Sequence, residues 1–160
     1  MSTITKGILP AFFAAMQNGY ANDSGEKTTI QALPGSKVTK FQSGNFTVTD
    51  CWFAPENVLH SSGFTLIAHK DIPVWTMSYQ GWYHPDAIPC LKAALRSAYD
   101  QRKFFGGRGD AFFSCDSMAY VNHFDPQNDW LDFRGREEIF RLDGGMRLGC
   151  HEYHGQALLK

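Results

Sequence analysis

Hydrophobic and polar residues alternate with a period of two over much of the chain. In the segment 74–80, for example, Trp75, Met77 and Tyr79 point to one side and the smaller residues between them to the other. This alternation predicts a β-strand with one buried face. Strands are predicted from residue 28 onward, and the other segments are 38–42, 46–53, 64–69, 118–123, 130–134, 137–142 and 146–153.

One segment has the helical period instead. Ile88, Leu91 and Leu95 recur at intervals of three and four residues, which predicts a helix over 88–102 with one buried side. Pro89 suits the first turn of this helix, because a proline there costs no intrahelical hydrogen bond.

A shorter helix is predicted over 10–18, with Pro10 in its first turn and Gly19 as a left-handed cap. Tight turns are expected at 43–45, 70–71 and 143–145. We therefore expect residues 1–160 to form a single α+β domain, in which a curved, mainly antiparallel β-sheet wraps around one long helix and the short N-terminal helix is added.

Composition narrows the class of protein. Aromatic residues make up 14% of the chain beside 15 glycines, a mixture typical of turn-rich β structure. A formal net charge of −1 offers no excess of positive charge for nucleic acid, so direct nucleic-acid binding is not expected. No apolar run approaches the roughly 18 residues needed to span a bilayer, and the first 15 residues do not form a signal peptide. Cytoplasmic location without a membrane partner is the resulting expectation.

The four cysteines are Cys51, Cys90, Cys115 and Cys150. They form no CxxC pair, so neither a disulfide framework nor a closed zinc site is indicated. We expect reduced, mostly buried thiols, and no cofactor is indicated.

Aromatic side chains concentrate between residues 75 and 83. Trp75, Tyr79, Trp82 and Tyr83 are candidates to line a ligand pocket, although Trp75 and Tyr79 also suit the core. Trp82 and Tyr83 follow Gly81 and are expected in a loop beyond the strand, at a pocket rim or at an interface such as a homodimer.

Charged candidates lie in the second half of the chain. Arg108 can pair with an anionic ligand or with a carboxylate such as Glu137, and the protein carboxylate is the commoner partner. Near the C-terminus, alternation puts Cys150, Glu152 and His154 on one strand face. These three are weak candidates for a metal site, whereas Glu137, Glu152 and His154 are the candidates for acid–base catalysis.

Several short motifs resemble those of a known family. They are the run 75–81, the helical 91–95, the Phe105-Gly-Gly-Arg-Gly109 loop and the segment 133–139, and together they span most of the chain. Their order is similar to that in an uncharacterised bacterial domain family, whose members occur alone or behind a helix-turn-helix DNA-binding domain. The C-terminal pattern departs from the family, because Tyr153 is followed by a single nearby glycine rather than a pair. The resemblance implies a sensor of a small molecule, which acts by itself or beside a separate DNA-binding protein.

Three functions remain open from the sequence. The first is a noncatalytic domain that binds or senses a small-molecule ligand in an aromatic-lined pocket. The second is an enzyme with a His/Glu acid–base or metal site near the C-terminus. The third is a protein-interaction module that uses Trp82 and Tyr83 as anchors.

Overall fold

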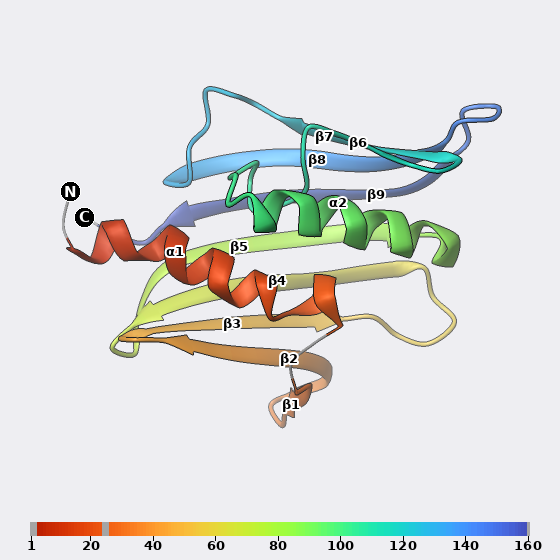
Figure 1. The fold of residues 1–160 in the computed structure, drawn as a ribbon. Helices are drawn as coiled ribbons and strands as arrows, with labels where there is room; N and C mark the ends of the chain where they lie inside the picture. The colour runs from red at the N-terminus through yellow and green to blue at the C-terminus, as the bar shows by residue number, and fades with distance from the viewer. Residues whose placement is uncertain (1–2, 24–25, 160) are drawn as a thin grey trace.

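A computed structural model describes residues 3–23 and 26–159. Within these ranges the chain forms two α-helices, two short 3-10 helices and nine strands (Figure 1). The helices are α1 (Thr3–Gln17), η1 (Tyr20–Asn22), η2 (Pro85–Ala87) and α2 (Ile88–Asp100). The strands are β1 (Thr28–Ile30), β2 (Leu33–Ser43), β3 (Phe46–Phe53), β4 (His60–His69), β5 (Ile72–Tyr83), β6 (Phe112–Cys115), β7 (Met118–Phe124), β8 (Asp132–Arg141) and β9 (Arg147–Ala157).

The strands form one antiparallel sheet in the order β1-β2-β3-β4-β5-β9-β8-β7-β6. Both α-helices lie against the same face of this sheet (Figure 1). We call this face the inner face; it carries Trp75, Met77 and Tyr79, as their alternation predicted. The opposite, outer face bears no helix among the described elements. The α+β class and the antiparallel sheet are confirmed.

The expectation of one long helix is wrong. α1 has 15 residues and α2 has 13, so the N-terminal helix is the longer of the two. α1 begins well before residue 10 and continues through Pro10, which lies inside the helix rather than in its first turn. Gly19 has φ −114° and is therefore not a left-handed cap.

The predicted hairpins are confirmed. Ser43 pairs with Phe46 and His69 pairs with Ile72, so each of these turns contains two residues. Lys70 and Asp71 both have positive φ, as a type I′ turn requires. Gly44 supplies the positive φ of the other turn, at 58°.

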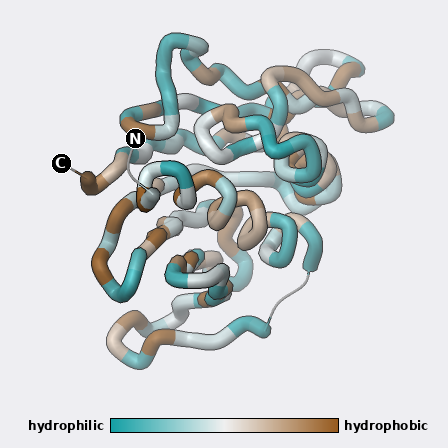
Figure 2. The backbone as a smooth tube through the Cα atoms, turned by 60° about the vertical axis from the view of Figure 1, so that its left-hand side comes forward, coloured by the Kyte–Doolittle hydropathy of each residue, from teal (hydrophilic) through white to brown (hydrophobic). Residues whose placement is uncertain are grey.

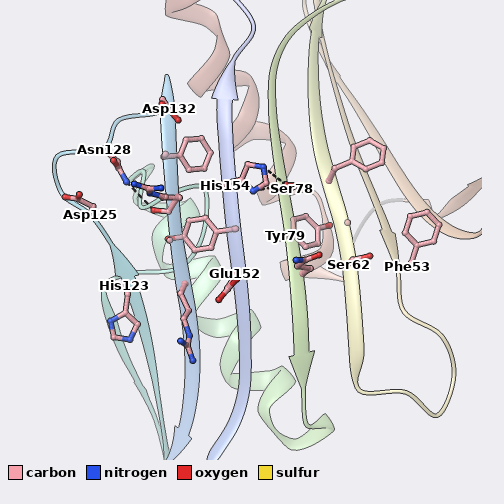
Figure 3. A pocket seen from close by; sticks show the side chains of 18 residues that line it. Phe53, Ser62, Ser78, Tyr79, His123, Asp125, Asn128, Asp132, Glu152 and His154 are labelled. Carbon is pink, nitrogen blue, oxygen red and sulfur yellow. Dashed lines mark hydrogen bonds between the residues drawn. The ribbon is translucent and has the colours of Figure 1, made fainter.

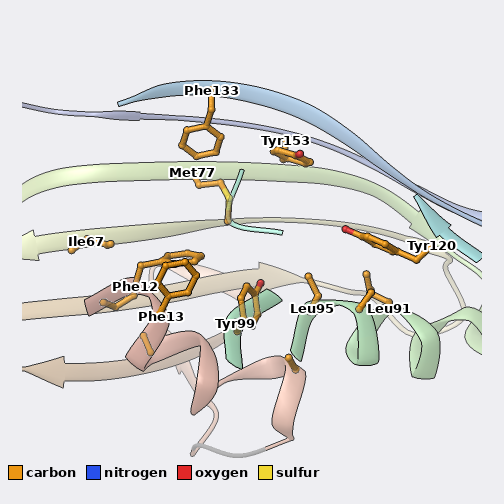
Figure 4. Close-up of a cluster of buried hydrophobic side chains, with 14 of the residues drawn as sticks. Phe12, Phe13, Ile67, Met77, Leu91, Leu95, Tyr99, Tyr120, Phe133 and Tyr153 are labelled. Atoms are coloured by element: carbon orange, nitrogen blue, oxygen red, sulfur yellow. The ribbon is translucent and has the colours of Figure 1, made fainter. Parts of the chain in front are cut away.

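The core fills the space between the inner face and the two helices (Figure 4). Phe12 of α1 contacts the rings of Trp75 and Tyr99 at centroid distances of 5.5 and 6.0 Å. On the other helix, Leu91 and Leu95 are fully buried, which confirms the face that the helical period predicted. Figure 2 shows hydrophobic residues in short stretches throughout the fold, and no helix of the described residues is long and apolar enough to span a membrane.

A disulfide joins Cys90 at the start of α2 to Cys115 at the end of β6. This contradicts the expectation of four reduced thiols, which rested on the absence of a CxxC pair. The two cysteines are 25 residues apart in the chain, but α2 packs against β6 and brings them together. Cys51 and Cys150 are free.

Candidate functional site

A cavity of about 280 Å³ lies between the inner face and the helices. One part of its wall is apolar and comes from helix residues such as Met16, Ile88, Leu91 and Leu95. Another part is polar and comes from the strands and from the loop after α2. The polar side chains that line it include Tyr20 and, from α2, Tyr99; the others are Asp50, His60, Ser61, Thr65, Tyr79, Tyr83, Arg108 and His151.

The mouth of the cavity lies at the segment that joins β3 to β4. Val58 and Leu59 both line the cavity and are about half exposed, at 52% and 46%. Pro85 of η2 lines the cavity as well. A small molecule can therefore reach the polar wall from this end of the sheet.

Strand register explains how one part of the polar wall forms. Ser61 of β4, Gly81 of β5 and His151 of β9 lie opposite one another on three adjacent strands. A Cβ at Gly81 would lie 2.6 Å from Cδ2 of His151, so the glycine leaves the space that the imidazole ring occupies. Across this glycine, Ser61 Oγ and His151 Nε2 form a hydrogen bond of 3.1 Å.

His151 is the most unusual side chain of the cavity. It is 4% exposed, and its Nδ1 is the one buried side-chain nitrogen or oxygen of the described residues without a hydrogen-bond partner. Its ring packs on those of Tyr83 and Tyr79, at centroid distances of 4.5 and 6.1 Å. Burial lowers the pKa of His151 to about 4, against an opposing effect of Glu137. The imidazole is therefore neutral near pH 7, and its Nδ1 has an unused hydrogen-bonding capacity in the wall of the cavity.

A buried ion pair between Arg108 and Glu137 positions another part of the cavity wall. Arg108 donates to Oε1 of Glu137 through Nε at 3.0 Å and also through Nη2. Glu137 is fully buried and accepts further hydrogen bonds of 2.6 Å from the hydroxyls of Tyr83 and Tyr120. Burial raises the pKa of Glu137, but the adjacent Arg108 more than offsets this and keeps the pKa below its usual value. Glu137 therefore stays ionised and fixes the positions of Arg108 and Tyr83.

Asp50 of β3 is a second buried carboxylate. Its Oδ1 accepts hydrogen bonds from Thr65 Oγ1 and from the Tyr79 hydroxyl, each of 2.9 Å. Burial raises the pKa of Asp50, and the two hydrogen bonds and the charge of Arg108 partly oppose this. Asp50 differs from Glu137 because no cation of the described residues contacts it.

The structure brings together three of the five residues that the sequence proposed for ligand binding: Tyr79, Tyr83 and Arg108 all line the cavity. Trp75 does not, because it is fully buried in the core, where it stacks on Phe133. Arg108 pairs with Glu137, the commoner of its two expected partners.

The expected loop position of Trp82 and Tyr83 is wrong. Both belong to β5, which continues through Gly81 to Tyr83. Tyr83 is buried on the inner face, so it is not an exposed anchor for a partner. Trp82 lies on the outer face, with the guanidinium carbon of Arg147 5.9 Å from its ring centroid.

The C-terminal candidates lie on the outer face as well. Glu152 and His154 line a broad hollow of about 980 Å³ there (Figure 3). Both side chains are exposed, and His154 forms a hydrogen bond with Ser78. Glu137 points to the inner face, so the three acid–base candidates do not converge on one site.

Cys150, Glu152 and His154 share the outer face as alternation predicted, but they do not form a metal site. Across residues 3–23 and 26–159, no group of three or more His, Cys, Asp or Glu side chains is arranged to hold a metal ion. The Cys150 thiol instead accepts a hydrogen bond of 3.2 Å from Nε of Arg136.

Sequence reasoning missed Asp50, Ser61 and the role of His151. Asp50 interrupts the apolar inward positions of β3, and a carboxylate at such a position is a signal of a buried polar site. Gly149, His151, Tyr153 and Gly155 occupy every second position of β9, so they share its inward face. The candidates that the sequence offered, Cys150, Glu152 and His154, are closely spaced potential metal ligands on the opposite, outer face.

Comparison with protein-family models, with curated proteins and with solved structures gave no match for this chain. The resemblance to a bacterial domain family stays a prediction.

Proposed function

We propose that this protein binds a small organic molecule in the cavity between the inner face of the sheet and its two helices. The observation that carries the proposal is the unpartnered Nδ1 of His151. A buried polar atom without a hydrogen bond costs about 1–3 kcal/mol, and a ligand that supplies the missing hydrogen bond recovers this cost.

The shape and lining of the cavity support the same proposal. Its volume of about 280 Å³ lies just below the range of roughly 300–1,000 Å³ that is usual for small-molecule sites, so the ligand is expected to be small. Apolar helix side chains and a few fixed polar groups are the usual lining of such sites. The polar groups are held firmly, because Tyr83 and Arg108 are both bonded to Glu137.

Binding is favoured over catalysis by the surroundings of His151. A serine next to a histidine is the arrangement of a nucleophile and its base. In this protein no carboxylate of the described residues bonds Nδ1 of His151, and its pKa of about 4 makes the imidazole a weak base. The pair is better suited to forming a hydrogen bond with a ligand than to activating Ser61.

The proposal is tested by a screen of small metabolites against the purified chain. A ligand present at 100 times its Kd stabilises the fold by about 2.7 kcal/mol, which corresponds to a rise in Tm of roughly 5–10 °C. Isothermal titration then measures the Kd of each compound that raises Tm.

Two matched variants locate the binding site. Ile88→Trp fills the apolar part of the cavity and should abolish binding. Ile72→Trp adds the same ring at the exposed start of β5 and should leave binding unchanged. A screen in which no compound raises Tm, or in which Ile88→Trp binds as tightly as the parent, would count against the cavity.

A further inference from the structure

The cavity wall holds one carboxylate whose charge is not balanced. Arg108 and Glu137 form a bonded pair and so contribute little net charge, and His151 is neutral near pH 7. Lys92, whose Nζ lies 4.8 Å from the centroid of the Tyr20 ring, pairs with Asp23, and neither residue lines the cavity. Asp50 is therefore the acidic group of the wall whose charge is not compensated, because no cation of the described residues contacts it.

The hydrogen bonds of Asp50 leave half of its carboxylate unused. Thr65 and Tyr79 both donate to Oδ1, and no side chain or backbone group within the described ranges donates to Oδ2. Asp50 is 9% exposed and lines the cavity. A buried carboxylate is costly unless it is paired with a cation and fully hydrogen-bonded, and a cationic ligand would supply both.

The rings around Asp50 favour a cation as well. Tyr20, Trp52, Tyr79, Tyr83 and Tyr99 line the same cavity. Aromatic faces attract cations, and this protein already uses one in that way, since the Arg108 guanidinium carbon lies 5.3 Å from the centroid of the Tyr79 ring. An anionic ligand would instead meet the carboxylate of Asp50 and a guanidinium that is already paired with Glu137.

We propose that the ligand of the inner cavity is an organic ammonium ion, which donates to Oδ2 of Asp50 and lays its apolar body against Leu91 and Leu95. This inference rests on the proposed function and adds the chemical class of the ligand. His151 supplies a neutral hydrogen-bonding atom for a further polar group of the same molecule.

The experiment compares three probes of similar size at pH 7 by isothermal titration on the full chain. They are 2-phenylethylamine, 2-phenylethanol and 3-phenylpropionate, which are cationic, neutral and anionic. We expect the amine to bind at least about tenfold more tightly than the alcohol, and the carboxylate to bind most weakly. Binding of the amine should be lost in Ile88→Trp, which shows that it occupies the cavity.

Asp50→Asn keeps the size of the side chain and its acceptor for Thr65 and Tyr79 but removes the charge. We expect it to abolish the preference for the amine over the alcohol. Glu152→Gln removes an exposed carboxylate of the outer face and should leave the preference unchanged.

Two results separate this inference from the proposed function. If the alcohol binds the cavity as tightly as the amine, the ammonium assignment is wrong while the cavity remains a binding site. If none of the three probes binds at millimolar concentration, the assignment also fails, and the metabolite screen decides the proposed function. The comparison of probes on the unaltered chain applies even if Asp50→Asn does not fold.

Discussion

Five rings of the inner face each lie against a glycine directly opposite on a neighbouring strand. A Cβ on any of these glycines would meet the facing ring at 2.1–2.7 Å. The pairs are Gly63 with Tyr79, Gly81 with His151, Gly149 with Tyr83, Gly135 with Tyr153 and Gly155 with Phe133. This pairing accounts for the joint abundance of glycine and aromatic residues, because large rings lie flat on the sheet only where the opposite residue has no side chain.

Gly81→Ala should therefore disrupt the sheet at the cavity. Its Cβ would lie 1.9 Å from the carbonyl oxygen of Cys150 and 2.8 Å from Cα of His151, so β5 and β9 would have to separate. We expect the free energy of unfolding to fall by about 3 kcal/mol, the upper end for overpacking, as measured by urea denaturation. Gln80→Ala changes the exposed neighbour and should alter stability by less than about 0.5 kcal/mol. Equal stability of the two variants would contradict this account.

The same glycines explain which residue-level predictions failed. The predicted strand segments 74–80 and 130–134 end just before Gly81 and Gly135, and glycine is most often found in turns. In this sheet both lie within continuous strands, β5 and β8, opposite large rings. Period-two alternation did identify Trp75, Met77 and Tyr79 correctly as inward residues. It does not reveal which residue of another strand faces a glycine, since that depends on register.

At the scale of elements, the disulfide connects the start of α2 to an edge of the sheet. β6 is the last strand in the sheet order, and it pairs only with β7 among the described strands. Cys115 ends β6 and is bonded to Cys90, which is buried in the first turn of α2. The bond therefore fixes the short edge strand against the helix that forms the apolar wall of the cavity.

Alkylation with iodoacetamide in guanidinium without a reductant should modify Cys51 and Cys150 only, as mass spectrometry would show after proteolysis. With reductant, all four cysteines should react. In the chain-entropy account, closing a loop of this length stabilises the fold by about 3 kcal/mol, so the double variant Cys90→Ala/Cys115→Ala should unfold at lower urea. The disulfide would be contradicted if all four cysteines were modified without reductant and the parent chain were no more stable than the double variant.

The elements could be predicted better than the way they are joined. The helical period identified α2 to within two residues, and turn chemistry located the hairpins at residues 44–45 and 70–71. The start of α1 was missed because Pro10 is typical of a first turn, whereas tertiary packing of Ile8 and Phe12 keeps the helix intact on both sides of it. The disulfide could not be predicted, because cysteines 25 residues apart carry no local signal of contact.

At the scale of the whole molecule, one sheet presents two different faces. The outer face carries exposed polar residues such as Glu152 and His154. The inner face carries the core and, within it, a cluster of ionisable groups around Arg108. Both sets of residues alternate along the same strands, so the face that carries the candidate site depends on where the helices pack. That packing is determined by contacts between residues far apart in the sequence.

The inner cluster also predicts how stability depends on pH. His151 has a pKa of about 4 in the folded chain and about 6.5 when unfolded. The folded state therefore binds fewer protons between these values, and its stability falls as the pH is lowered from 6.5 to 4. The loss of stability that this histidine causes is complete below pH 4, where it amounts to about 3 kcal/mol.

His151→Gln should remove that contribution, so its free energy of unfolding should fall less steeply between pH 6.5 and 4 than that of the parent chain, as measured by urea denaturation at several pH values. Asp50 acts in the opposite direction, because its raised pKa lets the folded state keep a proton that the unfolded state has lost. Glu137, whose pKa is lowered, removes stability only below about pH 4.5. Both carboxylates are present in the parent and the variant, so the difference between the two curves reports His151. His154→Gln makes the same substitution on the exposed outer face and is the control for the change of side chain. A His151→Gln curve parallel to the parent's would mean that this imidazole is not held neutral in the cavity.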